Sequence, residues 1–171
     1  MVNSNLRHFT VLHQNIQSMR NKLLDIDLVL KVREKNIDVL CLTEHWIQED
    51  YLTTIQIDQY KLVSYFGRKT HKHGGSCIYV KKSIRTRDVH YLGDISVEKD
   101  FEMSVVEVVT YGYIIVCIYR SPDGNYIQFL KNLELVIQKI QSKRKKLLLC
   151  GDWNLNFLVD NIRIQELENL L

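Results

Sequence analysis

The sequence is short of proline and of long apolar runs, and each shortage excludes a class of protein. Pro122 is the single proline in 171 residues, and 46% of the residues are hydrophobic. A chain of this composition is neither disordered nor linker-like. No apolar run approaches the roughly 20 residues that a membrane helix needs, and residues 1–9 lack the apolar core of a secretory signal. We therefore expect one globular domain over residues 1–171 with no membrane partner.

Cysteine is also sparse, and its spacing indicates neither a zinc site nor a redox pair. The four cysteines lie in separate apolar runs and form no CxxC pair: Cys41, Cys77, Cys117 and Cys150. Buried, reduced thiols of this kind are typical of an intracellular protein. The net charge of +3 is small. It permits a nucleic-acid partner without arguing for one.

The N-terminal part of the chain predicts a β-α-β unit. Residues 9–15 read as a strand, and a helix is expected from a cap at Ser18 to about Lys35, with apolar residues at helical spacing. Residues 37–42 form a second strand that is expected to be buried, and Glu44 follows it. Because the joints between these elements are short, the two strands should be parallel neighbours.

The middle of the chain predicts antiparallel strands, because no helical pattern separates one apolar segment from the next. Glycine-containing turns punctuate the expected strands, which are residues 60–66, 75–80, 87–92, 103–109 and 113–119. A type I turn at residues 121–124 then leads to a helix over residues 125–142. A strand at residues 147–150 and a last helix at residues 162–171 complete the pattern.

The strand at residues 147–150 is a continuous apolar run, which is typical of a strand buried on both faces. Asp152 and Asn154 come directly after it. In extended backbone, residues two positions apart point to the same face. An aspartate can serve as a base or a metal ligand, and an asparagine supplies a neutral amide. Turn chemistry after a strand would explain the same two residues, so the pair alone leaves both interpretations open.

Polar residues also follow three other predicted strands. Asn15 and Gln17 follow the first, Glu44 follows the second, and Tyr119-Arg120 ends another. Because the ends of several strands meet at one rim of a sheet, we expect these groups to converge. Carboxylates and amides without histidine or cysteine partners suit Mg²⁺. The set fits metal-assisted phosphodiester hydrolysis, and the sequence lacks the glycine-rich phosphate loop of nucleotide-binding proteins.

Several segments together resemble the endonuclease/exonuclease/phosphatase superfamily, and within it the endonuclease domains of non-LTR retrotransposons. The segments occur in the family's order: His13–Ser18, Leu40–Trp46, Gly74–Val80, Cys117–Pro122 and Leu147–Asn154. The combination of GDWN after an apolar strand with an upstream TE and a YRSP is rather specific. The resemblance implies an α/β fold of the DNase I type, a two-layered β-sandwich flanked by helices.

The resemblance also implies a metal site. Glu44 matches the family's metal-binding glutamate. Asn15 matches the asparagine of the first strand, which helps to arrange the metal and the phosphate. The implied cofactor is Mg²⁺, with Mn²⁺ as an alternative.

Further roles follow from the same resemblance. Tyr119 matches the tyrosine that contacts the scissile phosphate, and Arg120 beside it is expected to bind substrate. Asp152 matches the aspartate that orients or deprotonates the attacking water. Asn154 matches the asparagine that binds substrate and stabilises the transition state.

One part of the family pattern is missing. The family closes with a further aspartate and a terminal Ser-Asp-His, which residues 160–171 do not supply, and all six histidines lie at or before His90. We therefore expect a family domain that is truncated at its C-terminus and weak or inactive alone. The function implied by the resemblance is a Mg²⁺-dependent, DNA-nicking endonuclease domain of a retroelement. It would be a nuclear monomer, fused to or derived from a protein with a reverse transcriptase.

Two alternatives to this function stay open. One is another phosphoesterase on the same fold, such as an abasic-site nuclease or an inositol or lipid phosphatase. The other is a catalytically inert remnant or a binding module. Among the remaining residues, His45, His71 and His73 lack a metal-site spacing, and the last two are expected in a loop that touches DNA. The basic run at residues 143–146 fits a solvated joint better than a phosphate site.

Overall fold

Two four-stranded β-sheets pack face to face in the computed structural model, which describes residues 9–32, 36–159 and 161–171. The first sheet has the strand order β1 (Val11–Asn15), β2 (Val39–Thr43), β4 (Ser76–Lys81) and β3 (Tyr60–Phe66). The second has the order β5 (Thr86–Arg87), β6 (Glu102–Val108), β7 (Tyr113–Tyr119) and β8 (Lys146–Asp152). The predicted two-layered sandwich is confirmed.

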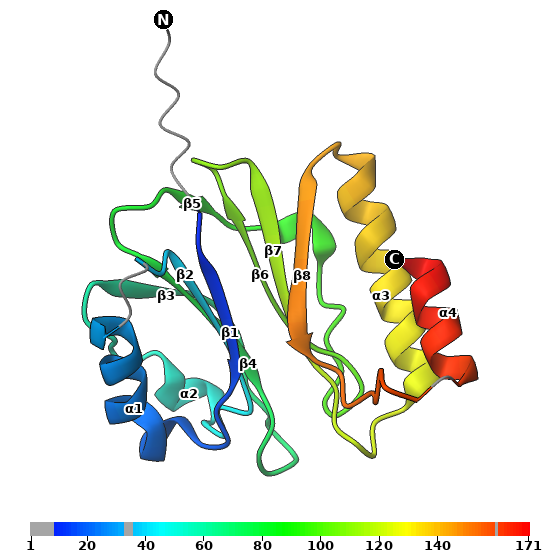
Figure 1. Cartoon of the computed structure of the whole chain (residues 1–171), viewed down its shortest axis with the longest axis horizontal. Helices are drawn as coiled ribbons and strands as arrows, with labels where there is room; N and C mark the ends of the chain where they lie inside the picture. Colours follow the sequence, from blue (N-terminus) through cyan, green and yellow to red (C-terminus); the bar gives the residue numbers. More distant parts are fainter. Residues whose placement is uncertain (1–8, 33–35, 160) are drawn as a thin grey trace, which may run out of the picture.

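Helices cover the outer face of each sheet (Figure 1). The first sheet carries α1 (Met19–Val32) and α2 (Glu49–Leu52), and the second carries α3 (Tyr126–Ser142) and α4 (Ile162–Leu170). A short 3₁₀ helix, η1, spans His90–Leu92. No helix among the described residues is both long and apolar enough to cross a membrane.

The apolar strands bury both of their faces because each face meets a different layer. In β2, Leu40 and Leu42 pack toward α1, whereas Val39 and Cys41 pack toward the second sheet. Every residue of β2 is buried, which is why this strand reads as an unbroken apolar run.

Both β-α-β units place the carboxyl ends of their strands at the same end of the sandwich. β1 and β2 are parallel, with Asn15 opposite Thr43, and β7 and β8 are parallel, with Tyr119 opposite Asp152. The other strand pairs are antiparallel, as predicted from the missing helices. Polar residues that follow these strands therefore meet at one rim.

The structure corrects two expectations about strands. β8 is only half-buried, because it lies at the edge of its sheet and pairs, among the residues that the structure describes, with β7 alone. The strand expected at residues 87–92 is mostly η1, since only Thr86 and Arg87 pair with β6. Val89 and Leu92, three positions apart, reach the core from a single 3₁₀ turn. The helix α2 was not predicted, and the expected helix end near Lys35 lies outside the described residues.

Candidate active site

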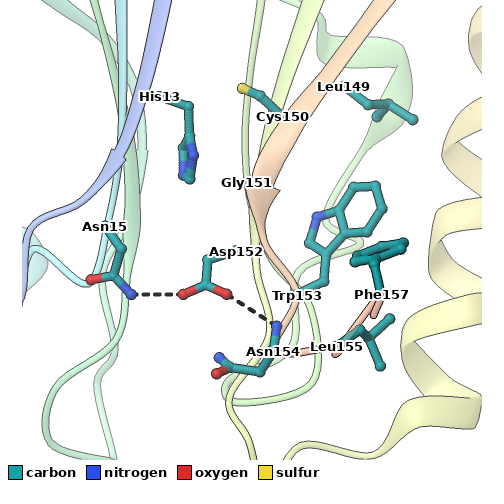
Figure 2. A pocket seen from close by; sticks show the side chains of 10 residues that line it. All are labelled: His13, Asn15, Leu149, Cys150, Gly151, Asp152, Trp153, Asn154, Leu155 and Phe157. Carbon is teal, nitrogen blue, oxygen red and sulfur yellow. Dashed lines mark hydrogen bonds between the residues drawn. The ribbon is translucent and has the colours of Figure 1, made fainter. Parts of the chain in front are cut away.

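The amide of Asn15 joins two carboxylates at the rim of the sandwich. Its Nδ2 donates to Glu44 Oε1 at 2.9 Å and to Asp152 Oδ2 at 2.7 Å. Figure 2 shows the bond to Asp152, which crosses from β1 to β8 and so links the two sheets. The structure thus brings together three of the residues that the sequence places on separate strands.

Glu44 is held by the backbone that follows β2. Its N–H donates to the carbonyl of Gly75 at 2.9 Å, and its own φ is 57°, a left-handed conformation in which the chain turns. The indole Nε1 of Trp46 donates to Glu44 Oε2 at 3.1 Å. With Asn15 on its other oxygen, the carboxylate is fixed in one orientation.

His45 supports this turn and is not a ligand. It is fully buried, its Nδ1 accepts the N–H of Ile47 at 3.0 Å, and its Nε2 therefore donates to the carbonyl of Phe66 at 2.9 Å. Burial lowers the pKa of His45 to about 4. A Cβ on Gly75 would lie 2.2 Å from His45 Nε2, so only glycine fits beside the imidazole.

Asp152 and Asn154 combine turn chemistry with a position in the site. Asp152 Oδ1 accepts the N–H of Asn154 at 3.1 Å, while Oδ2 accepts from Asn15. Asn154 has a φ of 50°, and its Nδ2 donates to the carbonyl of Arg120 at 2.7 Å. Gly151 must be glycine, because a Cβ there would lie 1.9 Å from the carbonyl oxygen of Ile118. Turn chemistry and a place in the site, the two interpretations that the sequence left open for this pair, are therefore compatible.

Tyr119 lies beneath the carboxylates with its side chain buried. Burial and the nearby carboxylate of Glu44 raise its pKa to about 12. The phenol therefore keeps its proton at neutral pH and can act as a hydrogen-bond donor. The guanidinium of Arg68 lies 5.8 Å from the centre of its ring.

Arg120, expected to bind substrate, is instead buried, with only 2% of its surface exposed. Its Nε donates to the carbonyl of Trp153 at 2.8 Å, its Nη1 to that of Gly124 at 2.7 Å, and its Nη2 to that of Asn154 at 3.0 Å. Every guanidinium nitrogen is used by the protein. This geometry replaces the predicted substrate contact with a positioning role for the segment that carries Asn154.

Sequence reasoning missed a buried ion pair behind the site. Arg68 Nε contacts Glu102 Oε1 at 2.5 Å, and Arg68 Nη2 donates to Ser121 Oγ at 2.5 Å. Glu102 Oε2 also accepts the N–H of Gly75 at 2.5 Å. Burial raises the pKa of Glu102 although these donors oppose the shift. In the sequence, the one sign of this ion pair was the acidic Glu102 between the apolar residues Phe101 and Met103.

A pocket of about 410 Å³ opens between β1 and β8 beside Asn15 and Asp152 (Figure 2). His13 and Cys150 face each other across the gap between the sheets, whereas Leu149, Trp153, Leu155 and Phe157 lie on the other side of β8. Burial lowers the pKa of His13, although Cys150 and Asp152 oppose the shift. Trp153 is part of the wall, with its ring 5.7 Å from that of Phe129.

A second groove, with basic and aromatic residues, is lined by Trp46, whose indole donates to Glu44. The rings of Trp46 and His73 lie against each other there, with centres 4.2 Å apart and planes inclined by 30°. The groove is lined by Arg20, Lys69 and Lys72 among others. As predicted, His71 and His73 lie in a loop, since no helix or strand covers residues 67–75.

Glu98 holds this loop in place. Its carboxylate accepts the N–H groups of Lys69, Thr70 and His71 at 2.6, 3.0 and 3.0 Å. Although partial burial opposes the shift, these bonds and the imidazole of His71 lower the pKa of Glu98 to about 2. The exposed Gln17 lies at the rim and donates its N–H to Asn15 Oδ1.

The donor set at the rim fits a hard cation. The two carboxylates and the amide oxygen of Asn15 offer only oxygen ligands, which suit Mg²⁺ or Mn²⁺ better than softer metals. The donors come from both sheets, so the closed sandwich is needed to assemble them.

Comparisons with known proteins agree with this fold. Residues 4–160 match the model of the Endonuclease/Exonuclease/phosphatase family. A Neisseria 3′ phosphatase, NExo, bound to a product DNA hairpin, has a TM-score of 0.70 at 17% identity, over 95% of this chain and 70% of that chain. A search of curated protein sequences finds no match.

Two further solved structures are similar. The endonuclease domain of TRAS1, a telomere-specific non-LTR retrotransposon, has a TM-score of 0.60 at 15% identity, over 95% of this chain and 72% of that chain. An AP endonuclease from Archaeoglobus fulgidus has a TM-score of 0.57 at 20% identity, over 85% of this chain and 57% of that chain. The chain thus spans 57–72% of the length of these three structures. On the family match over nearly its whole length, the chain belongs to the endonuclease/exonuclease/phosphatase family.

Proposed function

We propose that this chain is a Mg²⁺-dependent phosphodiesterase that nicks DNA, and that it is the endonuclease domain of a retroelement. The observation that carries the proposal is the amide of Asn15, which bridges Glu44 and Asp152 across the two sheets. A merely structural rim would not need two carboxylates held within reach of one amide. In a retroelement, such a domain would act in the nucleus and leave a 3′-hydroxyl for a reverse transcriptase.

Glu44 and the amide oxygen of Asn15 are the proposed ligands of the metal. When bound there, Mg²⁺ supplies positive charge that offsets the charge developing on the phosphate oxygens. Trp46 contributes by holding Glu44 Oε2, which keeps the carboxylate aimed at the rim. Mn²⁺ would use the same oxygen ligands.

Asp152 is the proposed base. Its carboxylate takes a proton from water, the water oxygen forms a bond to phosphorus, and the bond from phosphorus to the 3′-oxygen breaks, after which the 3′-oxygen takes up a proton from solvent. The products are a 3′-hydroxyl and a 5′-phosphate. The protonated phenol of Tyr119 and the second N–H of the Asn154 amide would donate to phosphate oxygens as charge develops.

The groove with Trp46 and His73 is the proposed path of the DNA. Arg20, Lys69 and Lys72 supply charge for the phosphate backbone, and the two rings offer a surface for an unpaired base. The similar NExo structure contains a product DNA hairpin, which supports DNA as the substrate class.

A plasmid assay tests this function. Supercoiled plasmid is incubated with a large excess of protein, which detects slow turnover, and the formation of nicked circles is followed with and without Mg²⁺. We expect nicking that requires Mg²⁺ and that falls on the order of 100-fold or more in Asp152→Asn, because the base is lost. The matched control is Asp88→Asn, an exposed aspartate beside β5 that should leave nicking unchanged.

Nicking that persists in Asp152→Asn, or that needs no metal, would contradict the proposal. A substrate panel of abasic DNA, inositol phosphates and phospholipid separates the other phosphoesterases of this fold. Hydrolysis of a small phosphate ester without plasmid nicking would favour them.

A further inference from the structure

The inner faces of the two sheets are arranged in layers whose chemistry changes toward the rim. The innermost of these layers is apolar, with Val11 opposite Val39 and Ile115 opposite Leu148. The outermost is made of oxygen-bearing side chains, with Asn15 opposite Thr43 and Tyr119 opposite Asp152. The layer between them is neither apolar nor made of oxygen-bearing side chains.

In β1, β2, β7 and β8, the middle layer presents one imidazole and three thiols. His13 pairs with Cys41 in the first sheet, and Cys117 pairs with Cys150 in the second. Each residue is two positions along its strand from a residue of the outer layer, so it faces the same side. The sandwich therefore brings three thiols from β2, β7 and β8 to one level.

The thiols are close enough to share one ligand. The sulfur atoms of Cys41, Cys117 and Cys150 all lie within 4.8 Å of one another. Tetrahedral zinc with bonds of about 2.3 Å to sulfur needs sulfur atoms about 3.8 Å apart, so a small contraction would suffice. Cys77, the fourth cysteine, packs on the opposite face of the first sheet and is not part of the cluster.

We propose that Cys41, Cys117 and Cys150 bind a thiophilic metal ion such as Zn²⁺ between the sheets, one layer behind the oxygen ligands of the rim. Three sulfur ligands select a soft or borderline ion, whereas the rim selects a hard one. On binding, the three thiols release their protons to solvent, and the ion forms three bonds to thiolate sulfur. The site is independent of the proposed nuclease function.

The pocket supplies a route for the ion and, on its opposite wall, an imidazole that would have to move toward the three sulfur atoms to become a fourth ligand. Cys150 is the half-exposed member of the cluster and lines the pocket. His13 faces it from the opposite wall, and its Nε2 contacts Thr43 Oγ1 at 3.3 Å (Figure 2). That contact leaves Nδ1 of His13 as the available nitrogen. A set of three cysteines and one histidine is a common structural zinc site.

The spacing of the cysteines in the sequence gives no sign of this site, because each ligand comes from a different strand. An ion held there would tie β2 in the first sheet to β7 and β8 in the second. It would also hold Cys150, two positions before Asp152, in a fixed place. We therefore expect metal binding to raise the melting temperature of the whole chain.

Cobalt substitution tests the proposal directly. The full chain, purified with reductant and freed of metal, is titrated anaerobically with Co²⁺. We expect one equivalent to produce thiolate-to-cobalt charge-transfer absorption that Zn²⁺ abolishes and Mg²⁺ does not. Cys150→Ser should remove most of this absorption and the rise in melting temperature with Zn²⁺. Cys77→Ser is the matched control, since it replaces a buried cysteine outside the cluster.

Glu44→Gln separates the two sites, because it should leave the cobalt spectrum unchanged. The titration of the unsubstituted chain with Co²⁺ does not depend on whether any variant folds. If it gives no charge-transfer absorption, the proposal is overturned. A spectrum that Cys77→Ser and Cys150→Ser weaken equally would overturn it too, as would a disulfide within the cluster in protein purified with reductant.

Discussion

At the scale of single residues, Asn15 shows which part of the site the sequence could predict and which part it could not. Its position after a strand, together with the family resemblance, was enough to group it with Glu44 and Asp152. The sequence could not show that its amide donates to both carboxylates, because that depends on how the two sheets are placed. Arg120 shows the opposite case. A charged residue next to a motif tyrosine suggests substrate binding, yet each of its three guanidinium nitrogens donates to a backbone carbonyl.

His45 makes the stability of the fold depend on pH. Its pKa is about 4 in the folded chain, below its ordinary value of 6.5, so the unfolded chain binds the proton first as the pH falls. Neutral His45 therefore contributes on the order of 3 kcal/mol to the free energy of unfolding above pH 6.5, and this contribution is lost as the pH falls from about 6.5 to 4. Urea unfolding at a series of pH values measures this slope.

The matched variants for this prediction are His45→Asn and His90→Asn. The first should flatten the slope between pH 6.5 and 4, even if it lowers stability overall. The second replaces an exposed histidine and should leave the slope as it is. An unchanged slope in His45→Asn would show that another group is responsible.

At the scale of elements, the strands with a strong local signal were predicted well. β7 has the expected bounds because an unbroken apolar run with a turn at each end defines it, and β3 has the expected bounds although Lys61 and Ser64 interrupt its apolar pattern. β8 was expected to be buried on both faces, and its place at a sheet edge left it half-buried. The apolar pattern predicts whether the two faces of a strand are buried. Whether a neighbouring strand covers its edge depends on the rest of the sheet.

The loop of residues 67–75 depends on a contact that no local pattern reports. Arg68 and Glu102 are both buried and join this loop to β6. Glu102→Gln would leave the guanidinium buried without its partner, and we expect a loss of about 3–5 kcal/mol in the free energy of unfolding. Urea unfolding measures the loss.

An exposed ion pair supplies the comparison for that prediction. Asp25 pairs with Lys22 on the surface of α1. Asp25→Asn should leave the free energy of unfolding nearly unchanged, because solvent screens the exposed pair. If both substitutions cost the same small amount, the buried pair does not hold the loop.

At the scale of the whole molecule, three apolar clusters account for the layers. One lies between the sheets, and one lies under the helices on each outer face. A stretch of exposed apolar residues after β8 belongs to none of them: Phe157, Leu158, Val159 and Ile162. Exposed apolar side chains of this kind promote association when the chain is heated.

Leu158→Lys tests whether these side chains promote association. Leu158 is 95% exposed, so the substitution should leave the melting temperature unchanged while raising the temperature at which light scattering begins. Leu24→Lys is the control, since Leu24 is 83% exposed and lies on α1, which covers the other sheet. Equal effects of the two substitutions would mean that added charge alone, and not this surface, controls aggregation.

The site as proposed holds one metal ion on Glu44 and the amide oxygen of Asn15 at the rim, with the base Asp152 beside it across the two sheets. The most direct measurement is Mn²⁺ binding followed by electron paramagnetic resonance on the full chain, with Mg²⁺ as competitor. We predict one Mn²⁺ that Mg²⁺ displaces, that Glu44→Gln abolishes and that Cys150→Ser leaves in place. Unaltered Mn²⁺ binding by Glu44→Gln would contradict the account.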